Sequence, residues 1–169
     1  MAAALAALCI APSQARGAAP SDTSAAGGPP FEAGVRTAIH QHLGRPYVWG
    51  AAGLRSFDCS GFVWRVMQDN GIFLKRTTAR KYYMSLPRVA REDRWTFGNI
   101  VFFSDLKHCG IVDTDESFYH ASVTEGTHLS PLTPLWRSRI SGFRAMPGSS
   151  VARTPAVRRP PASDQPVQP

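Results

Sequence analysis

Apolar residues recur at helical spacing in the first half of the chain. In residues 31–44, FEAGVRTAIHQHLG, Val35, Ile39 and Leu43 return every four positions, and the stretch closes at Gly44. Side chains at this spacing lie on one face of a helix, and glycine commonly follows a helix end. A second stretch, 59–71, has the same spacing through Phe62, Val63, Val66 and Met67 and also ends in glycine. Both stretches predict amphipathic helices, and a third, basic helix is expected around 78–86.

The pattern changes after Gly98 to short apolar runs separated by turn-forming residues. These runs are NIVFF, CGIV, SFYHAS and SGFRAM. Their length and spacing are typical of strands in a small antiparallel sheet. Helices followed by strands predict an α+β fold, with the N-terminal helices packed on the sheet in one domain over 31–146.

The two ends of the chain differ in composition from the middle. All 17 aromatic residues lie between Phe31 and Phe143, whereas ten of the 14 prolines lie outside 31–146. Segments without large apolar side chains bury too little surface to offset the entropy of ordering them. We therefore expect a disordered linker over 17–30 and a disordered, Pro-rich, basic tail over 147–169.

The first 16 residues contain an apolar run of the length found in signal peptides, followed by a small-x-small pattern at Ser13 to Ala15. This predicts a signal peptide over 1–16 and export to the periplasm or cell envelope. No Lys or Arg precedes the run, so a disordered alanine-rich head is the alternative. No apolar run approaches the roughly 18 residues of a membrane-spanning helix, and no span is expected.

The net charge of +7 is concentrated in one segment. Residues 75–94 contain seven Lys or Arg and two Asp or Glu. A basic face of this kind could contact nucleic acid, anionic lipid or an acidic cell-wall polymer. The chain has no nucleic-acid-binding motif, so we expect no nucleic-acid partner.

Cys59 is the strongest candidate for chemistry, because it stands in RSFDCSGF where a loop becomes a helix. The positive end of a helix dipole lowers the pKa of a thiol there, and the thiolate is the nucleophilic form. Free backbone N–H groups of the first helical turn could stabilise an oxyanion. The sequence therefore predicts a reactive cysteine.

His108 and His120 are the candidate bases for this thiol. They flank the turn-forming DTDES, and a hairpin centred near Thr114 would place them directly opposite each other, with Cβ atoms roughly 5 Å apart. One imidazole could then orient the other, as the third member of a catalytic triad does. His40, His42 and His128 are expected to be ordinary surface histidines.

Six motifs in order give the chain a resemblance to a known family. They are RPYVWGAA, FDCSGFVWRV, GIFLKRTTA, GNIVFFSDLKHCGIV, FYHAS and LWRSRISGFRAM, and they cover nearly all of 45–146. The chain resembles the NlpC/P60 family of bacterial cell-wall cysteine peptidases, which have a papain-like fold. The resemblance implies an enzyme that cleaves peptidoglycan stem peptides, often between γ-D-glutamate and a diamino acid, without a cofactor.

The resemblance also assigns residues to roles. It implies Cys59 as nucleophile, His108 as base and His120 as the residue that orients it. Tyr47 is similar to the family tyrosine near the oxyanion, and Asp58 and Ser60 resemble positions that line the substrate cleft. The chain departs from the family pattern at Ala51, Lys75, Lys81 and Asn99, which bears on substrate preference rather than on the triad. Cys109 occupies a usually apolar position and is expected to turn to the opposite face, into the core.

Three other functions are compatible with the same residues. The enzyme could be an amidase or acyltransferase acting on another amide. Cys59, His108 and His120 could bind zinc, although they lack compact ligand spacing, and otherwise no metal is expected. A disulfide between Cys59 and Cys109 would instead make a catalytically silent wall-binding or redox module. The sequence does not determine the oligomeric state, and we expect a monomer.

Overall fold

The computed structural model describes residues 29–152 of the 169-residue chain. The three expected helices are present as α1 (Pro29–Gln41), α2 (Cys59–Asp69) and α3 (Ala79–Ser85). Helix α1 begins two residues earlier than expected, because proline is compatible with the first turn of a helix. The expected signal peptide, most of the linker and the tail from 153 onward lie outside the described residues.

The second half of the described chain forms one five-stranded antiparallel sheet. Its strands are β1 (Ile100–Phe103), β2 (His108–Val112), β3 (Ser117–Ser122), β4 (Gly126–Pro131) and β5 (Ile140–Arg144), in the order β4-β3-β2-β1-β5. A short helix, α4 (Pro134–Ser138), joins β4 to β5. The predicted α+β class is confirmed, and each of the four predicted apolar runs contributes a strand.

Two elements were not predicted, namely β4 and α4. The segment GTHLSP has little apolar content, and it is a strand because six of its residues pair with β3 at the sheet edge. An edge strand tolerates proline, since one side of its backbone needs no partner. Helix α4 has only five residues, with Thr133 as its N-cap and a proline in its first turn.

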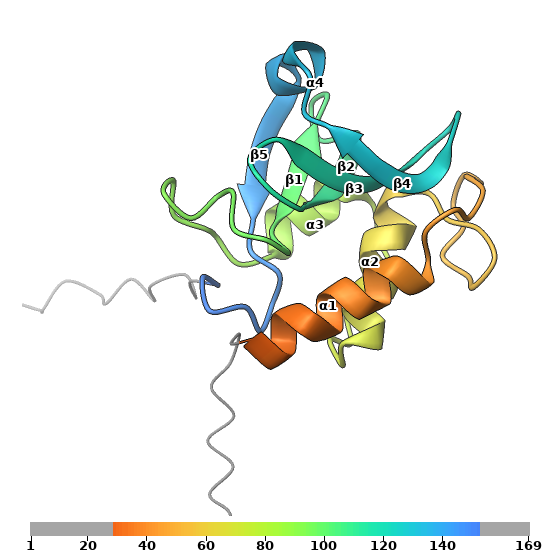
Figure 1. Ribbon diagram of the computed structural model, residues 1–169, viewed down its shortest axis with the longest axis horizontal. Helices are drawn as coiled ribbons and strands as arrows, with labels where there is room; N and C mark the ends of the chain where they lie inside the picture. Colours follow the sequence, from red (N-terminus) through yellow and green to blue (C-terminus); the bar gives the residue numbers. More distant parts are fainter. Residues whose placement is uncertain (1–28, 153–169) are drawn as a thin grey trace, which may run out of the picture.

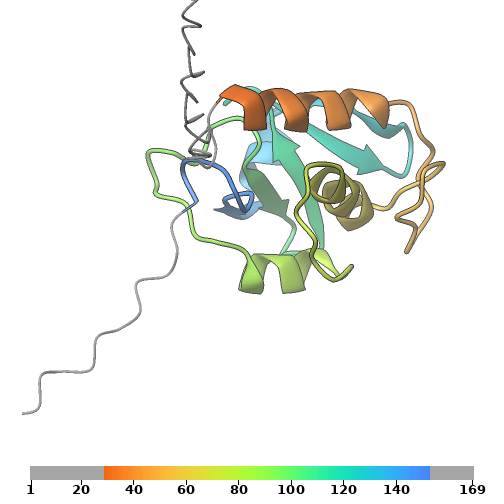
Figure 2. The same ribbon diagram turned by 90° about the horizontal axis from the view of Figure 1, so that it is seen from below.

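Helices α1, α2 and α3 pack on one face of the sheet, and a second apolar cluster covers the other face. Figure 1 shows α1 and α2 on one side of the strands and α4 away from them, and Figure 2 shows α1 and α3 on either side of α2. The helix-facing side of the sheet carries Ile100, Phe102, Cys109, Ile111, Tyr119 and Ala121. The opposite side carries Val101, Phe103, Val112 and Phe118, with Leu132 and the partly buried Trp95 and Trp136 packed against them. Alternation along each strand produces this division.

The hairpin between β2 and β3 differs from the predicted register. Ile111 pairs with Tyr119 and Val112 with Phe118, so the hairpin is centred at position 115 rather than 114. The prediction that His108 and His120 lie directly opposite each other was therefore wrong. The shift moves the partner of each residue by two positions, so each side chain stays on the same face of the sheet. The two histidines therefore remain diagonal neighbours on adjacent strands.

Candidate active site

Helix α2 begins at Cys59 because the preceding residue caps it. Asp58 has extended backbone angles, and its Oδ1 accepts a hydrogen bond of 2.6 Å from the N–H of Gly61, as an N-cap side chain does. Its Oδ2 accepts a second bond of 2.9 Å from the N–H of Gly50 in the preceding loop. A Cβ at Gly61 would collide with the carbonyl of Ala51, so glycine allows this loop to lie against the helix start. Cys59 is thereby held at the first helical position.

The Asp58 carboxylate is paired with a residue that the sequence analysis did not single out. Arg76 Nη2 lies 2.6 Å from Asp58 Oδ1 and 2.7 Å from Oδ2, and Arg76 Nη1 donates to Ser60 Oγ at 3.0 Å. Ser60 Oγ in turn donates to Asp58 Oδ1 at 3.0 Å. The two predicted cleft residues therefore form one network with Arg76, which comes from the basic segment 75–94. That segment supplied a charge signal, but charge alone could not identify the partner of Asp58.

The Cys59 side chain is surrounded by groups that favour its thiolate. A hydrogen bond with the Cys109 thiol, together with a hydrogen bond and positive charge from His108, lowers the pKa of Cys59 to about 5, against the effect of burial. Cys59 is 7 % exposed, and Cys109 is fully buried. Cys109 lies in the core, as expected, but that core includes Cys59, so the two thiols are in contact rather than apart. The same hydrogen bond raises the pKa of Cys109.

The rings of His108 and His120 are joined on the face of the sheet that carries Phe103 and Trp136, away from α1, α2 and α3. His108 Nε2 lies 2.8 Å from His120 Nδ1. His120 is almost fully buried, and burial, followed by the charges of His108 and His128, lowers its pKa to about 3. His120 is therefore neutral near pH 7. Trp136 of α4 stacks on His108 with ring centroids 5.6 Å apart.

Two further polar residues extend this pair, and sequence reasoning missed both. His120 Nε2 lies 2.9 Å from Ser130 Oγ, which lies 2.7 Å from His128 Nε2. The expectation that His128 is an ordinary surface histidine was wrong, because β4 places it beside β3. His42 was also misjudged, since it is buried and bonds Asp69 at 2.7 Å. The first error arose from the unpredicted pairing of β4 with β3, and the second from a contact between segments 27 residues apart.

Most of the predicted site residues line a single pocket. This pocket has a volume of about 510 Å³ and is lined by Tyr47, Trp49, Gly50, Asp58, Cys59, Ser60, 76–80, Leu106 and Lys107. Burial and the nearby charges of Cys59 and Asp58 raise the pKa of Tyr47, which keeps its hydroxyl protonated. Three consecutive residues, Ser104 to Leu106, have positive φ angles and form a tight turn that places Lys107 at the pocket wall. The pocket thus combines the thiol, a hydroxyl donor and a basic wall.

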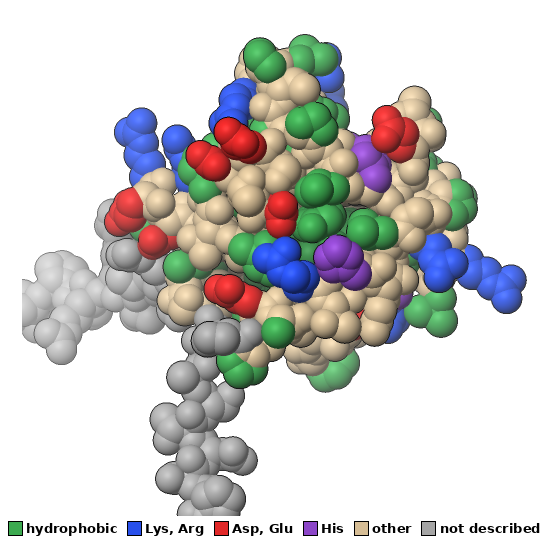
Figure 3. Space-filling view, in the orientation of Figure 1, with side chains coloured by type: hydrophobic (Ala, Val, Ile, Leu, Met, Phe, Trp, Pro, Cys, Tyr) green, Lys and Arg blue, Asp and Glu red, His purple; other side chains and the backbone are tan. Residues whose placement is uncertain are grey.

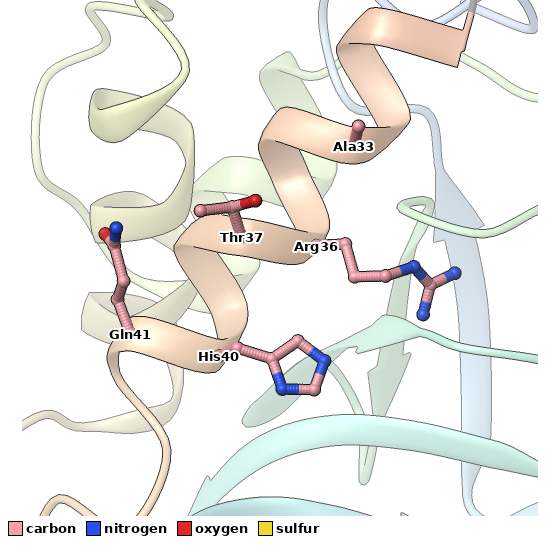
Figure 4. Close-up of a pocket in the computed structure, with 5 residues that line it drawn as sticks. All are labelled: Ala33, Arg36, Thr37, His40 and Gln41. Carbon is pink, nitrogen blue, oxygen red and sulfur yellow. The ribbon is translucent and has the colours of Figure 1, made fainter.

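A second hollow lies along α1 and shares no residue with this pocket. It is lined by Ala33, Arg36, Thr37, His40 and Gln41, and Figure 4 shows Arg36 and His40 extending from the same side of the helix. Figure 3 shows that this face of the molecule mixes basic, acidic, histidine and apolar side chains. Arg36 pairs with Asp113 at 3.4 Å and stacks on Phe97. None of the predicted site residues lies there.

Cys59 and Cys109 are free thiols in this structure. Within residues 29–152, no group of three or more His, Cys, Asp or Glu side chains is arranged to hold a metal ion. The same residues contain no helix of the length and apolarity that crossing a membrane would require.

A cysteine at a helix start that contacts a histidine on an antiparallel sheet defines a papain-like arrangement of fold and site. The family model for the NlpC/P60 family matches residues 44–145, which is more than half of the chain. This chain belongs to the NlpC/P60 family, and the fold that the resemblance implied is confirmed.

Individual relatives agree with this assignment. The probable peptidoglycan endopeptidase LytE of Bacillus subtilis is 34 % identical over 107 residues, covering 60 % of this chain and 30 % of that protein. The probable endopeptidase p60 of Listeria innocua is 42 % identical over 74 residues, covering 42 % of this chain and 15 % of that protein. The chain thus spans less than a third of these relatives. A solved Staphylococcus aureus structure, described as similar to lipoprotein of the NLP/P60 family, superposes with a TM-score of 0.62 at 27 % identity, covering 75 % of this chain and 45 % of the other.

Proposed function

We propose that this protein is an exported cysteine endopeptidase that hydrolyses amide bonds in peptidoglycan stem peptides, at the bond between γ-D-glutamate and a diamino acid. The observation that carries the proposal is the Cys59 thiol, which bonds with His108 and has its pKa lowered to about 5. A thiol in this state is ionised at neutral pH and is a nucleophile. His120, joined to the far side of the His108 ring, completes a Cys-His-His triad.

The first half of the reaction forms a thioester. The Cys59 thiolate attacks the carbonyl carbon of the scissile amide, and negative charge develops on the carbonyl oxygen. Asp58 already accepts from the N–H groups of Gly61 and Phe62, so the amides of Cys59 and Ser60 are the first-turn donors that we assign to this oxygen. The protonated Tyr47 hydroxyl is a further donor. His108 then gives its proton to the leaving amine as the C–N bond breaks.

The second half of the reaction releases the acyl group. His108, now neutral, takes a proton from water as the water oxygen attacks the thioester carbonyl. The C–S bond breaks, the product leaves with a new carboxylate, and the thiolate is restored beside a protonated His108. His120 accepts the His108 Nε2–H throughout, because its pKa of about 3 keeps it neutral. The cycle needs no cofactor.

The substrate class is supported by the family and by the charge of the pocket. The relatives named above include a probable peptidoglycan endopeptidase. Arg80 and Lys107 line the pocket, whereas the charge of Arg76 is matched by Asp58. Stem peptides carry carboxylates, and the positive charges of Arg80 and Lys107 favour their approach. Export to the periplasm or envelope, where this substrate is found, is part of the proposal.

Digestion of purified peptidoglycan tests the proposed function. We expect the wild-type protein to release muropeptide fragments whose masses correspond to cleavage after γ-D-glutamate. Cys59→Ala should release none, while its circular dichroism and melting temperature stay close to those of the wild type. His40→Ala, an exposed histidine on α1, is the matched control and should retain full activity. Cleavage by Cys59→Ala would refute the nucleophile, and fragments of another amide bond would refute the assigned bond.

A further inference from the structure

A chain of hydrogen-bonding side chains continues from His120 to a backbone carbonyl at the far edge of the sheet. His128 Nδ1 lies 3.0 Å from the carbonyl oxygen of Gly126. A carbonyl oxygen accepts and never donates, so His128 Nδ1 must carry a proton. In a neutral imidazole the other nitrogen is then a lone pair, which makes His128 Nε2 an acceptor.

With the His128 ring in this neutral form, the assignment determines every bond in the chain. Ser130 Oγ lies 2.7 Å from His128 Nε2 and donates its single proton there. The Ser130 oxygen is left as the acceptor for His120 Nε2–H, at 2.9 Å. His120 is neutral and has only one N–H, so its Nδ1 is a lone pair and accepts from His108 Nε2–H at 2.8 Å.

The direction of these bonds reaches the reacting sulfur. Because His108 donates to His120 from Nε2, the single proton of neutral His108 is on Nε2. The basic nitrogen is then Nδ1, which is the ring nitrogen left for Cys59. When His108 is protonated, Nδ1–H can donate to the thiolate while the Nε2–H bond to His120 is unchanged. If every hydrogen bond in the chain ran in the opposite direction, neutral His108 would carry its proton on Nδ1. Its lone pair would then be on Nε2, facing His120 and not the substrate.

We propose that Ser130 and His128 are positioning residues, which fix the tautomer of His108 through His120 and so present its Nδ1 to Cys59. This inference rests on the proposed function only in taking His108 as the base. Neither residue lines the Cys59 pocket, so their effect passes through the ring of His120. Glu125 Oε2 lies 3.4 Å from His128 Nε2, but this carboxylate is 67 % exposed and forms an ion pair only with a protonated His128, not with the neutral ring of the proposed chain.

The tautomer can be read without any activity measurement. In the Cys59→Ala background no thiolate bonds the His108 ring, and ¹⁵N-detected imidazole spectra of its neutral form report which nitrogen carries the proton. We expect His108 to be protonated on Nε2. Adding Ser130→Ala should shift it toward a mixture with Nδ1–H, and adding Ser130→Thr, which keeps the hydroxyl, should not. His128→Phe removes the acceptor of Ser130 and should act like Ser130→Ala, which provides a second test if one variant fails to fold.

Kinetics of the same substitutions in the active protein complete the test. Loss of one orienting hydrogen bond should lower kcat about tenfold with KM nearly unchanged. Ser130→Thr keeps the hydroxyl and should retain most of the wild-type kcat. Ser85→Ala, an exposed serine that bonds its own helix at Lys81, is the matched control. An unchanged Nε2–H tautomer and an unchanged kcat in Ser130→Ala would overturn the inference. Hydrolysis by Cys59→Ala would instead overturn the proposed function, and the spectra would still decide this inference.

Discussion

Replacing Cys109 by valine tests how Cys59, the proposed nucleophile, is ionised. Valine has a similar size but no S–H, so the substitution removes the hydrogen bond to the Cys59 thiolate. A hydrogen bond to a charged group is worth about 1.5–3 kcal/mol, and each pKa unit corresponds to about 1.4 kcal/mol. The pKa of Cys59 should therefore rise from about 5 to about 6–7.

Alkylation by iodoacetamide shows whether the pKa of Cys59 rises or falls. A lowered pKa means that the thiolate is present above about pH 5 and is lost as the pH falls below it. At pH 6 the thiolate fraction should fall from about 90 % in the wild type to about 10–50 % in Cys109→Val, so alkylation slows about two- to ninefold. At pH 8.5 the two proteins should react at similar rates. Peptide mapping separates Cys59 from Cys9 and from Cys109.

Two controls make this prediction specific. Cys109→Ser keeps a donor at the same position and should leave the midpoint near that of the wild type. Cys109→Ala removes the donor and leaves a small cavity, so it should shift the midpoint as valine does despite the opposite change in volume. An alkylation midpoint that stays near pH 5 in both Cys109→Val and Cys109→Ala would refute the reasoning.

Two further substitutions test the framework of the site. Arg76→Gln leaves the Asp58 carboxylate without its ion pair and should lower the free energy of unfolding, measured by urea titration, by about 3 kcal/mol. Arg80→Gln changes an exposed side chain and should lower it by less than about 0.5 kcal/mol. Equal effects of the two substitutions would contradict the role of the ion pair. At Gly110 an added Cβ would lie 2.7 Å from two atoms of β3 and 3.2 Å from His120 Cβ. Gly110→Ala should therefore cost about 1–3 kcal/mol and lower kcat, while Gly53→Ala, with open space around it, should do neither.

The sequence predicted the elements that have strong periodic patterns. The apolar positions of α1 and α2 are buried, and α3 follows the N-cap Thr78. Strand β4 was missed because GTHLSP has no alternation of apolar and polar residues and is held by pairing with β3. Pairing of this kind depends on the whole hairpin, which local patterns do not encode.

The candidate site was predicted in its residues but only partly in its geometry. Cys59, His108 and His120 are brought together, yet the register of the hairpin differs by one position at its centre. Arg76, Ser130 and Cys109 acquire their roles from contacts across 18, 10 and 50 residues of sequence, respectively. The fold alone brings these contacting residues together, so composition and spacing could not identify the roles of Arg76, Ser130 and Cys109.

The central claim is that the ionised sulfur of Cys59 performs the reaction, and partial alkylation tests it most directly. The wild-type protein is treated with increasing iodoacetamide at pH 6, and peptide mapping gives the modified fraction of Cys59 beside the residual rate of peptidoglycan hydrolysis. Our account predicts that activity falls in direct proportion to modification and reaches zero when Cys59 is fully alkylated. Hydrolysis that persists in fully alkylated protein would contradict it.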